Sequence, residues 1–124
     1  MTAAPAASSG SDLVGGELVR EVFRRVRAGD LSVADLYEED ADLYYADVHA
    51  HGREAIRRFY RRTIDVMKPR CVVEALLETP PLYAALIDLP TTKGHQKALD
   101  LFELGPSGIH RIEIYIRPDA VVGR

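Results

Sequence analysis

The chain of 124 residues is long enough to bury the hydrophobic core of one domain. It is 47% hydrophobic and 28% charged, with a net charge of −3, a composition that argues against a nucleic-acid-binding protein because such proteins are usually basic. No apolar run approaches the length that spans a bilayer, so we expect no membrane partner. The single cysteine, Cys71, excludes an internal disulfide and predicts a reducing, cytoplasmic compartment.

Residues 1–12 are rich in Ala, Ser and Pro and contain neither a basic start nor a hydrophobic segment. We therefore expect a disordered tail there rather than a secretory signal. Residues 119–124 are expected to form a short C-terminal tail, which leaves residues 13–118 as a single domain.

The first predicted element is an amphipathic helix over residues 15–28. Leu18, Val22 and Val26 recur at helical spacing, and arginines occupy much of the remaining surface. Gly29 is well placed to end this helix.

Ser32 and Asp35 resemble a capping box and predict a short second helix over residues 33–37. Residues 42–47 are expected to form a strand. A third helix is predicted over residues 53–67, where apolar residues recur at helical spacing and Pro69 follows. Its apolar stripe contains Ile56, Phe59, Tyr60, Ile64 and Met67.

After Pro69 the hydrophobic period changes from helical to roughly two, which is typical of strands. Four strands are predicted, over residues 70–77, 82–89, 95–104 and 109–116. Two helices, a strand, a helix and then four consecutive strands indicate an α+β domain.

Residues 93–94 are expected to form a tight hairpin turn, with Thr92 opposite His95 and Ile87 opposite Asp100. In this register the pocket-facing side of the hairpin carries Tyr83, Ala85, Ile87, Leu89, Ala98, Asp100, Phe102 and Leu104. The opposite side carries Ala84, Leu86, Asp88, Leu99, Leu101 and Glu103. That side is too apolar for a solvated face, so we expect a homodimer through the sheet, or cover by another element.

Asp100 is the candidate catalytic acid, because it stands among apolar side chains. Burial there raises the pKa of a carboxyl, and a neutral carboxyl can donate a proton or a hydrogen bond. Two alternatives remain open: Asp100 is hydrated or paired with Lys97, or a one-residue register shift turns it outward and Glu103 inward.

Residues 44–51 concentrate phenols, an acid and imidazoles. Asp47 is a candidate general base, or else a turn residue, and Tyr45 is a hydrogen-bond donor to substrate, or else a core aromatic. His49 is a candidate pocket residue, since an imidazole titrates near neutrality, whereas His51 is more typical of a structural residue. Two histidines alone do not make a metal site, so none is predicted.

The order of elements and several local motifs resemble the nuclear transport factor 2-like superfamily, which includes ketosteroid isomerases, limonene-epoxide hydrolases and SnoaL-type polyketide cyclases. The resemblance covers about residues 18–117. The motifs that carry it are Ala28-Gly29-Asp30-Leu31, Leu36-Tyr37-Glu38-Glu39-Asp40-Ala41, His51-Gly52-Arg53-Glu54-Ala55-Ile56, Ala98-Leu99-Asp100-Leu101-Phe102 and Arg111-Ile112-Glu113-Ile114-Tyr115. The resemblance implies a cone-shaped, curved antiparallel or mixed sheet wrapped around three N-terminal helices, with a pocket at one end.

Ketosteroid isomerases combine an Asp base on the first strand with a Tyr on the first helix and a protonated Asp on a late strand. By this resemblance Asp100 corresponds to the late-strand Asp. The first-helix Tyr falls near Val22, and the base position falls on Tyr45, with Asp47 two residues further on. The resemblance therefore implies a relative with a rearranged acid–base set.

Epoxide hydrolases of this superfamily use an Asp–Arg–Asp set to activate water. Arg111 and Glu113 could pair on the last strand, but alternation favours Ile112, Ile114 and Ile116 as its pocket-facing residues. The hydrolase interpretation is therefore an alternative rather than the leading one.

Together these patterns predict a cofactor-independent isomerase, cyclase or hydrolase for an apolar, oxygen-bearing substrate of polyketide, terpenoid or steroid type. The expected catalytic residues are Asp100, Asp47 and Tyr45. The expected substrate-binding residues are Tyr83, Ile87, Phe102, Ile112, Ile114 and His49. The alternative from another class is a non-catalytic ligand-binding or dimerisation module of the same fold.

Overall fold

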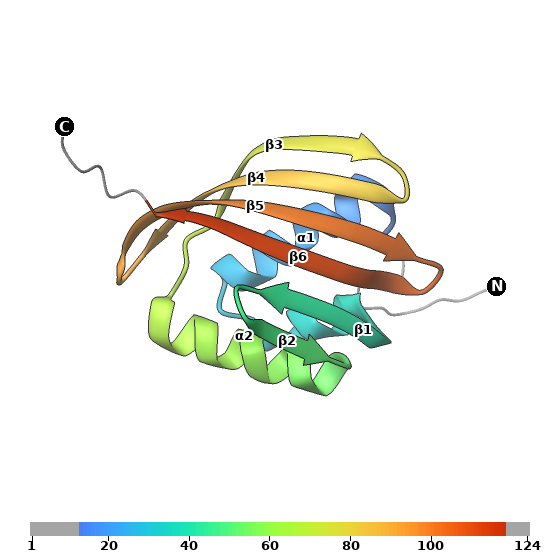
Figure 1. The fold of residues 1–124 in the computed structure, drawn as a ribbon, viewed down its shortest axis with the longest axis horizontal. Helices are drawn as coiled ribbons and strands as arrows, with labels where there is room; N and C mark the ends of the chain where they lie inside the picture. The colour runs from blue at the N-terminus through green and yellow to red at the C-terminus, as the bar shows by residue number, and fades with distance from the viewer. Residues whose placement is uncertain (1–12, 119–124) are drawn as a thin grey trace.

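The computed structural model describes residues 13–118, and the two predicted tails lie outside them. The helices are α1 (Gly15–Arg27), the 3-10 helix η2 (Leu31–Leu36) and α2 (Arg53–Met67). Figure 1 shows that helices α1 and α2 lie on one side of a curved sheet. The strands are β1 (Tyr37–Tyr45), β2 (Val48–His51), β3 (Val72–Thr79), β4 (Leu82–Thr91), β5 (Gly94–Gly105) and β6 (Gly108–Pro118).

The six strands form one sheet in the order β2-β1-β6-β5-β4-β3. All neighbouring strands are antiparallel except β1 and β6, which run parallel. This mixed, curved and unclosed sheet confirms the predicted α+β class. Between residues 13 and 118, none of the helices is both long and apolar enough to cross a bilayer.

Helices α1 and α2 agree closely with the sequence prediction. Helix α1 buries Leu18, Val22 and Val26 on one face, as their spacing predicts. Helix α2 has the predicted bounds and ends at Met67, and the following residue, Lys68, caps it with a positive φ of 44° before Pro69.

The predicted capping box at the second helix was wrong. Asp30 caps this segment, because its carboxylate accepts a hydrogen bond from the backbone N–H of Ser32 at 2.9 Å. Asp35 instead forms an ion pair with Arg57 at 2.9 Å. The segment is a 3-10 helix that ends at Leu36, and β1 begins directly after it at Tyr37.

The first strand begins earlier and ends earlier than predicted. Strand β1 stops at Tyr45, and Ala46 adopts a positive φ of 53° in a tight turn with Asp47. The chain then returns as β2, with Leu43 opposite Ala50. The predicted strand continued through this turn, because neither Ala46 nor Asp47 is a glycine that would mark it.

The hairpin between β4 and β5 differs from the predicted register by two residues. Its loop is Thr92-Lys93, so Thr91 lies opposite Gly94 and Ala85, rather than Ile87, lies opposite Asp100. A shift of two residues leaves every side chain on its predicted face, because side chains alternate with a period of two. Asp100 therefore faces the helices, as expected.

Candidate functional site

A cavity of about 750 Å³ lies between helix α2 and the concave face of the sheet. Its apolar wall comes from α1, α2 and all strands except β3, and includes Phe23, Phe59, Ile87, Ile114 and Ile116. The titratable side chains that line it are Tyr45, Arg58, Tyr60, Arg62, Cys71 and Asp100. Among the described residues of this lining, Asp100 is the single carboxyl group.

Asp100 is the chemically unusual residue of the cavity. It lies on β5 between the buried Ala98 and Phe102, and only 6% of it is exposed. Its Oδ1 atom is buried and has no hydrogen-bond partner among residues 13–118. A buried carboxyl oxygen without a partner destabilises the fold by about 1–3 kcal/mol, so this arrangement favours a site that awaits a ligand.

Burial raises the pKa of Asp100 from 3.8 to about 8, because the apolar surroundings disfavour the carboxylate. The carboxyl is therefore protonated at neutral pH and can donate a hydrogen bond. The alternative pairing with Lys97 is excluded by geometry. The Lys97 Nζ atom contacts Glu74 at 2.7 Å and Asp88 at 3.2 Å, and alternation along β5 places Lys97 on the other face of the sheet.

Two buried tyrosines form a hydrogen-bonded pair beside this site. The hydroxyl groups of Tyr37 on β1 and Tyr60 on α2 lie 2.6 Å apart. Burial raises the pKa of both phenols, and the charge of an ionised Asp100 would raise them further. Both groups are therefore neutral, and Tyr60 lines the cavity. The sequence analysis assigned Tyr60 only to the apolar stripe of the helix.

Cys71 also lines the cavity, but it is not a nucleophile. Burial raises the pKa of its thiol to about 12, so the reactive thiolate is absent at neutral pH. Cys71 is therefore a buried packing residue of the wall.

Tyr45, Ile87 and Ile114 lie where the sequence analysis expects them, in the cavity wall. Tyr45 is half-buried, and its ring packs edge-on against Phe59 at a centroid distance of 5.9 Å. A phenol therefore occupies the wall at the end of β1.

The expected placement of Asp47 and His49 in the pocket was wrong. Because β1 ends at Tyr45, Asp47 is exposed in the turn and does not line the cavity. On β2, alternation directs Val48 and Ala50 towards the cavity and His49 away from it. His49 instead stacks on Tyr44, with ring centroids 4.4 Å apart.

Tyr83, Phe102 and Ile112 were expected in the cavity wall, and this placement was also wrong. All three face the helices but are buried in the core outside the cavity lining. Phe102 packs edge-on against Phe23, with ring centroids 5.8 Å apart. This part of the interior is filled by side chains, whereas the open space lies between α2 and the middle of the sheet.

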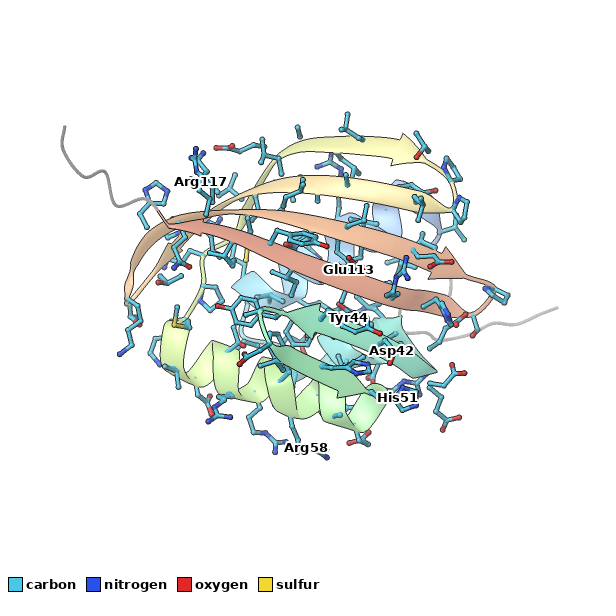
Figure 2. All side chains as sticks on the ribbon, in the orientation of Figure 1. Asp42, Tyr44, His51, Arg58, Glu113 and Arg117 are labelled. Carbon is cyan, nitrogen blue, oxygen red and sulfur yellow. The ribbon has the colours of Figure 1, made fainter. Side chains whose placement is uncertain are left out.

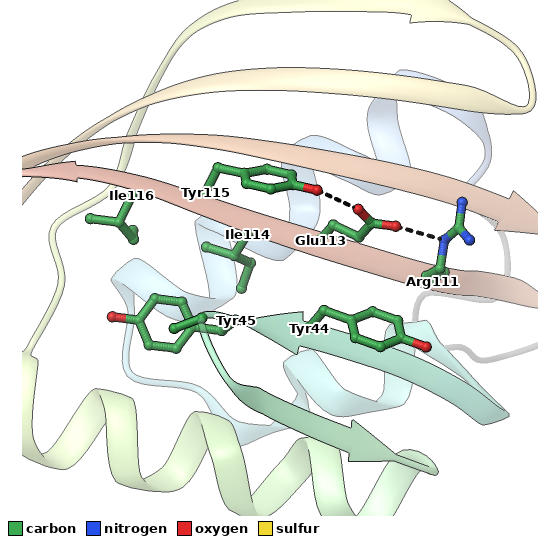
Figure 3. A pocket seen from close by; sticks show the side chains of 8 residues that line it. Tyr44, Tyr45, Arg111, Glu113, Ile114, Tyr115 and Ile116 are labelled. Carbon is green, nitrogen blue, oxygen red and sulfur yellow. Dashed lines mark hydrogen bonds and ion pairs between the residues drawn. The ribbon is translucent and has the colours of Figure 1, made fainter.

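The outer face of β6 carries Arg111, Glu113 and Tyr115, as alternation predicts. Figure 3 shows the shallow pocket of about 580 Å³ that they line together with Tyr44 and Tyr45. Arg111 contacts Glu113 at 3.4 Å and Glu103 at 3.2 Å, and the Tyr115 hydroxyl donates a hydrogen bond to Glu113. An Asp–Arg–Asp set is therefore not assembled in the cavity, which removes support from the epoxide-hydrolase interpretation.

Two groups among residues 13–118 could hold a metal ion by the placement of their ligand atoms: Asp42 with His49 and His51, and Glu38 with Asp40 and His110. The two histidines of β2 stand out in the sequence, but Asp42 does not, and its part in this group was not predicted. That residue joins them only because β1 and β2 pair, which a pattern along one strand does not reveal.

Solved structures with the same architecture identify the fold. A candidate ketosteroid isomerase from Kribbella flavida superposes with a TM-score of 0.77 at 18% identity, covering 95% of this chain and 87% of that chain. A candidate polyketide cyclase from Sinorhizobium meliloti superposes with a TM-score of 0.75 at 15% identity, covering 84% and 96%.

The chain has the nuclear transport factor 2-like fold. A ketosteroid isomerase-like protein from Catenulispora acidiphila, solved in complex with trimethylamine, has the same fold, with a TM-score of 0.73 at 13% identity over 82% of this chain and 86% of that one. No protein-family model matches the sequence, and no curated protein matches it. Identities this low relate the chains by fold alone, so the activity has to be argued from the cavity.

Proposed function

We propose that this protein is a cofactor-independent enzyme that transfers a proton on an apolar, oxygen-bearing small molecule, with Asp100 as the acid–base group. The observation that carries the proposal is the buried Oδ1 atom of Asp100, which has no hydrogen-bond partner among the described residues and belongs to a residue lining the cavity. A substrate oxygen in the cavity would supply the missing hydrogen bond.

Protonated Asp100 would donate to a carbonyl or hydroxyl oxygen of the substrate and stabilise the negative charge that develops there. A pKa of about 8 also lies close to neutral pH, where a general acid or base works best. Asp47 does not line the cavity, so the proposal assigns the acid to Asp100 alone, and a solvent water molecule in the cavity would accept the proton that leaves the carbon beside the carbonyl. Tyr45 would help to position the substrate oxygen.

The cavity wall indicates the substrate class. About 750 Å³ is a volume typical of small-molecule sites, and the lining is mostly aliphatic and aromatic. The neighbours named as a candidate polyketide cyclase and a candidate ketosteroid isomerase support a substrate of polyketide, terpenoid or steroid type. Isomerisation and cyclisation both need a proton donor of the kind that Asp100 supplies.

Hydrogen exchange in heavy water tests the proposal without knowledge of the natural substrate. We expect the protein to catalyse exchange at the carbon beside the carbonyl of an apolar cyclic ketone such as a tetralone, measured by NMR. Asp100→Asn should reduce this exchange to the buffer rate, whereas Thr63→Ser, a change at another polar lining residue, should keep it. Equal exchange by the wild type and Asp100→Asn would contradict the proposal.

The second candidate is a non-catalytic ligand-binding module. It is favoured by Val22, which stands where the resemblance to ketosteroid isomerases places a tyrosine, and by the absence of a second carboxyl among the described lining residues. A binding module would bind a fluorescent naphthol in the cavity but would not catalyse hydrogen exchange on the cyclic ketone.

We further propose a homodimer through the outer face of β4 and β5, in the cytoplasm. Leu86 and Leu99 are 41% and 43% exposed there, and Leu101 lies two residues beyond Leu99 on the same face of β5. Leu101→Glu should give monomers in sedimentation, and a persistent dimer would contradict this interface. Cell fractionation would test the compartment.

A further inference from the structure

Three side chains gather on the outer face of the sheet, at the edge formed by β1 and β2: Asp42, His49 and His51. We propose that they form a binding site for a divalent transition metal such as Zn²⁺, with one coordination position left to solvent. The site lies on the opposite face from the cavity and is independent of the proposed catalytic function.

The pairing of two short strands creates this arrangement. Asp42 on β1 lies directly opposite His51 on β2, and His49 comes two residues before His51. Residues two apart on a strand share one face, so the three side chains project on the same side. The His49 Nε2 and His51 Nδ1 atoms each lie 2.7 Å from Asp42 Oδ1. Figure 2 labels Asp42 and His51 at this edge of the sheet.

The distances fit a metal after a small adjustment. Zn²⁺ binds imidazole nitrogen and carboxylate oxygen at about 2.0–2.2 Å, which places tetrahedral ligand atoms about 3.3 Å apart. The Asp42 oxygen therefore has to move roughly half an ångström away from each nitrogen. The side chains of His49, His51 and Asp42 are 49%, 66% and 25% exposed, so they can rotate without disturbing the core.

The chemistry of the donor set favours a transition metal over Mg²⁺ or Ca²⁺, which prefer oxygen ligands alone. Two imidazoles and one carboxylate are typical of sites with an open position, because three protein ligands leave room for water. Tyr44 stacks on His49 with an angle of 11° between the rings, which holds this imidazole in place.

No other cation competes for the Asp42 carboxylate among the described residues. Arg111 lies beside Asp42 across the β1–β6 pairing, but its guanidinium is engaged by Glu103 and Glu113. The two imidazoles are the hydrogen-bond partners of Asp42, and their nitrogens meet the same carboxylate oxygen. The three side chains therefore already converge on one point, where a metal ion could replace these hydrogen bonds.

Two other histidine–carboxylate pairs among residues 13–118 provide matched controls, because each brings one imidazole to its carboxylate. The second group with metal-compatible spacing, Glu38 with Asp40 and His110, offers a single imidazole where the first group offers two. His95 contacts Asp88, which also pairs with Lys97. His110 contacts Glu38, whose carboxylate is buried and also accepts hydrogen bonds from the backbone N–H and the hydroxyl of Ser107. Each of these two carboxylates contacts one imidazole. Its remaining partner is another side chain or backbone group: Lys97 for Asp88, and Ser107 for Glu38.

Isothermal titration of the untagged full chain with Zn²⁺ tests the proposal. We expect one site per chain. Asp42→Asn, His49→Gln and His51→Gln should each raise the Kd at least about tenfold, as loss of a metal ligand does. His95→Gln and His110→Gln should leave the Kd unchanged. A metal that binds only the native state stabilises the native state. Zn²⁺ should therefore also raise the Tm of the wild type, but not the Tm of the double variant that carries both His49→Gln and His51→Gln.

Two results would overturn the proposal: no saturable binding up to millimolar Zn²⁺, or a loss of affinity in His110→Gln or His95→Gln as large as in His51→Gln. Asp100→Asn should keep the wild-type Kd. This result separates the metal site from the acid–base site, since either proposal can fail while the other stands.

Discussion

The two faces of β5 place the same chemical group in opposite environments. Asp100 faces the helices, is buried with no partner for Oδ1 within residues 13–118, and has a pKa raised to about 8. Glu103, three residues later, faces outward and contacts Arg111 at 3.2 Å. The direction that alternation gives each side chain decides whether a carboxyl becomes a reactive neutral acid or an ordinary partner in an ion pair.

The largest difference between the two faces should appear on truncation of a side chain. Phe102 is fully buried on the inner face, so Phe102→Ala should lower the free energy of unfolding by about 3–5 kcal/mol. Leu99 lies on the outer face and is 43% exposed in the single chain, so Leu99→Ala should cost less than about 1 kcal/mol at protein concentrations that dissociate the proposed dimer. Urea unfolding of both variants measures this contrast, and similar losses would mean that the outer face is covered.

A second effect should appear in the pH dependence of stability. Native Asp100 keeps its proton between its ordinary pKa of 3.8 and about 8, whereas the unfolded chain has lost it. Raising the pH through this window therefore favours unfolding, by up to about 1.4 kcal/mol per pH unit. Asp100→Asn removes this contribution, so unfolding curves of wild type and variant should converge at low pH and diverge as pH rises. Parallel curves would show that Asp100 is ionised in the native state.

The buried tyrosine pair should give a smaller effect. Tyr37→Phe leaves the Tyr60 hydroxyl without its partner at 2.6 Å and should lower the free energy of unfolding by about 1–3 kcal/mol. Tyr37→Phe combined with Tyr60→Phe should cost less than the sum of the two single changes, since no hydroxyl is then left unpaired. Additive losses in this double-mutant cycle would mean that the two hydroxyls are not coupled.

The smallest effect should come from the outer ion pairs. Lys97→Met removes contacts to Glu74 and Asp88 at the surface of the sheet. Exposed ion pairs contribute about 0–1 kcal/mol and are screened by salt. We therefore expect a change below about 1 kcal/mol in thermal unfolding, and less in high salt. A larger, salt-independent loss would show that this part of the outer face is shielded from water.

Patterns that repeat along one element were predicted well from the sequence. The bounds of α2 follow from the spacing of Ile56, Phe59 and Tyr60 and from Pro69. The inward direction of Asp100 was predicted even though the hairpin register was wrong by two residues, because a shift of two preserves the face.

Features that depend on two elements meeting were not predicted. The pairing of Tyr37 with Tyr60 and the convergence of Asp42 with two histidines require the packed structure. Asp47 was misplaced because the turn at Ala46 has a positive φ that its sequence does not signal. The division of the inner face into an open cavity and a filled core around Phe102 depends on how the helices pack on the sheet.

The parallel pairing of β1 with β6 has a consequence for the order of assembly. The first hairpin, β1–β2, reaches the rest of the sheet only through β6, the last strand of the chain (Figure 1). During synthesis, β3, β4 and β5 can form a meander from neighbouring segments, whereas β1 must wait for the final strand to be made. Closure of the cavity wall, which needs Tyr45 beside Ile114, is therefore a late and long-range event in folding.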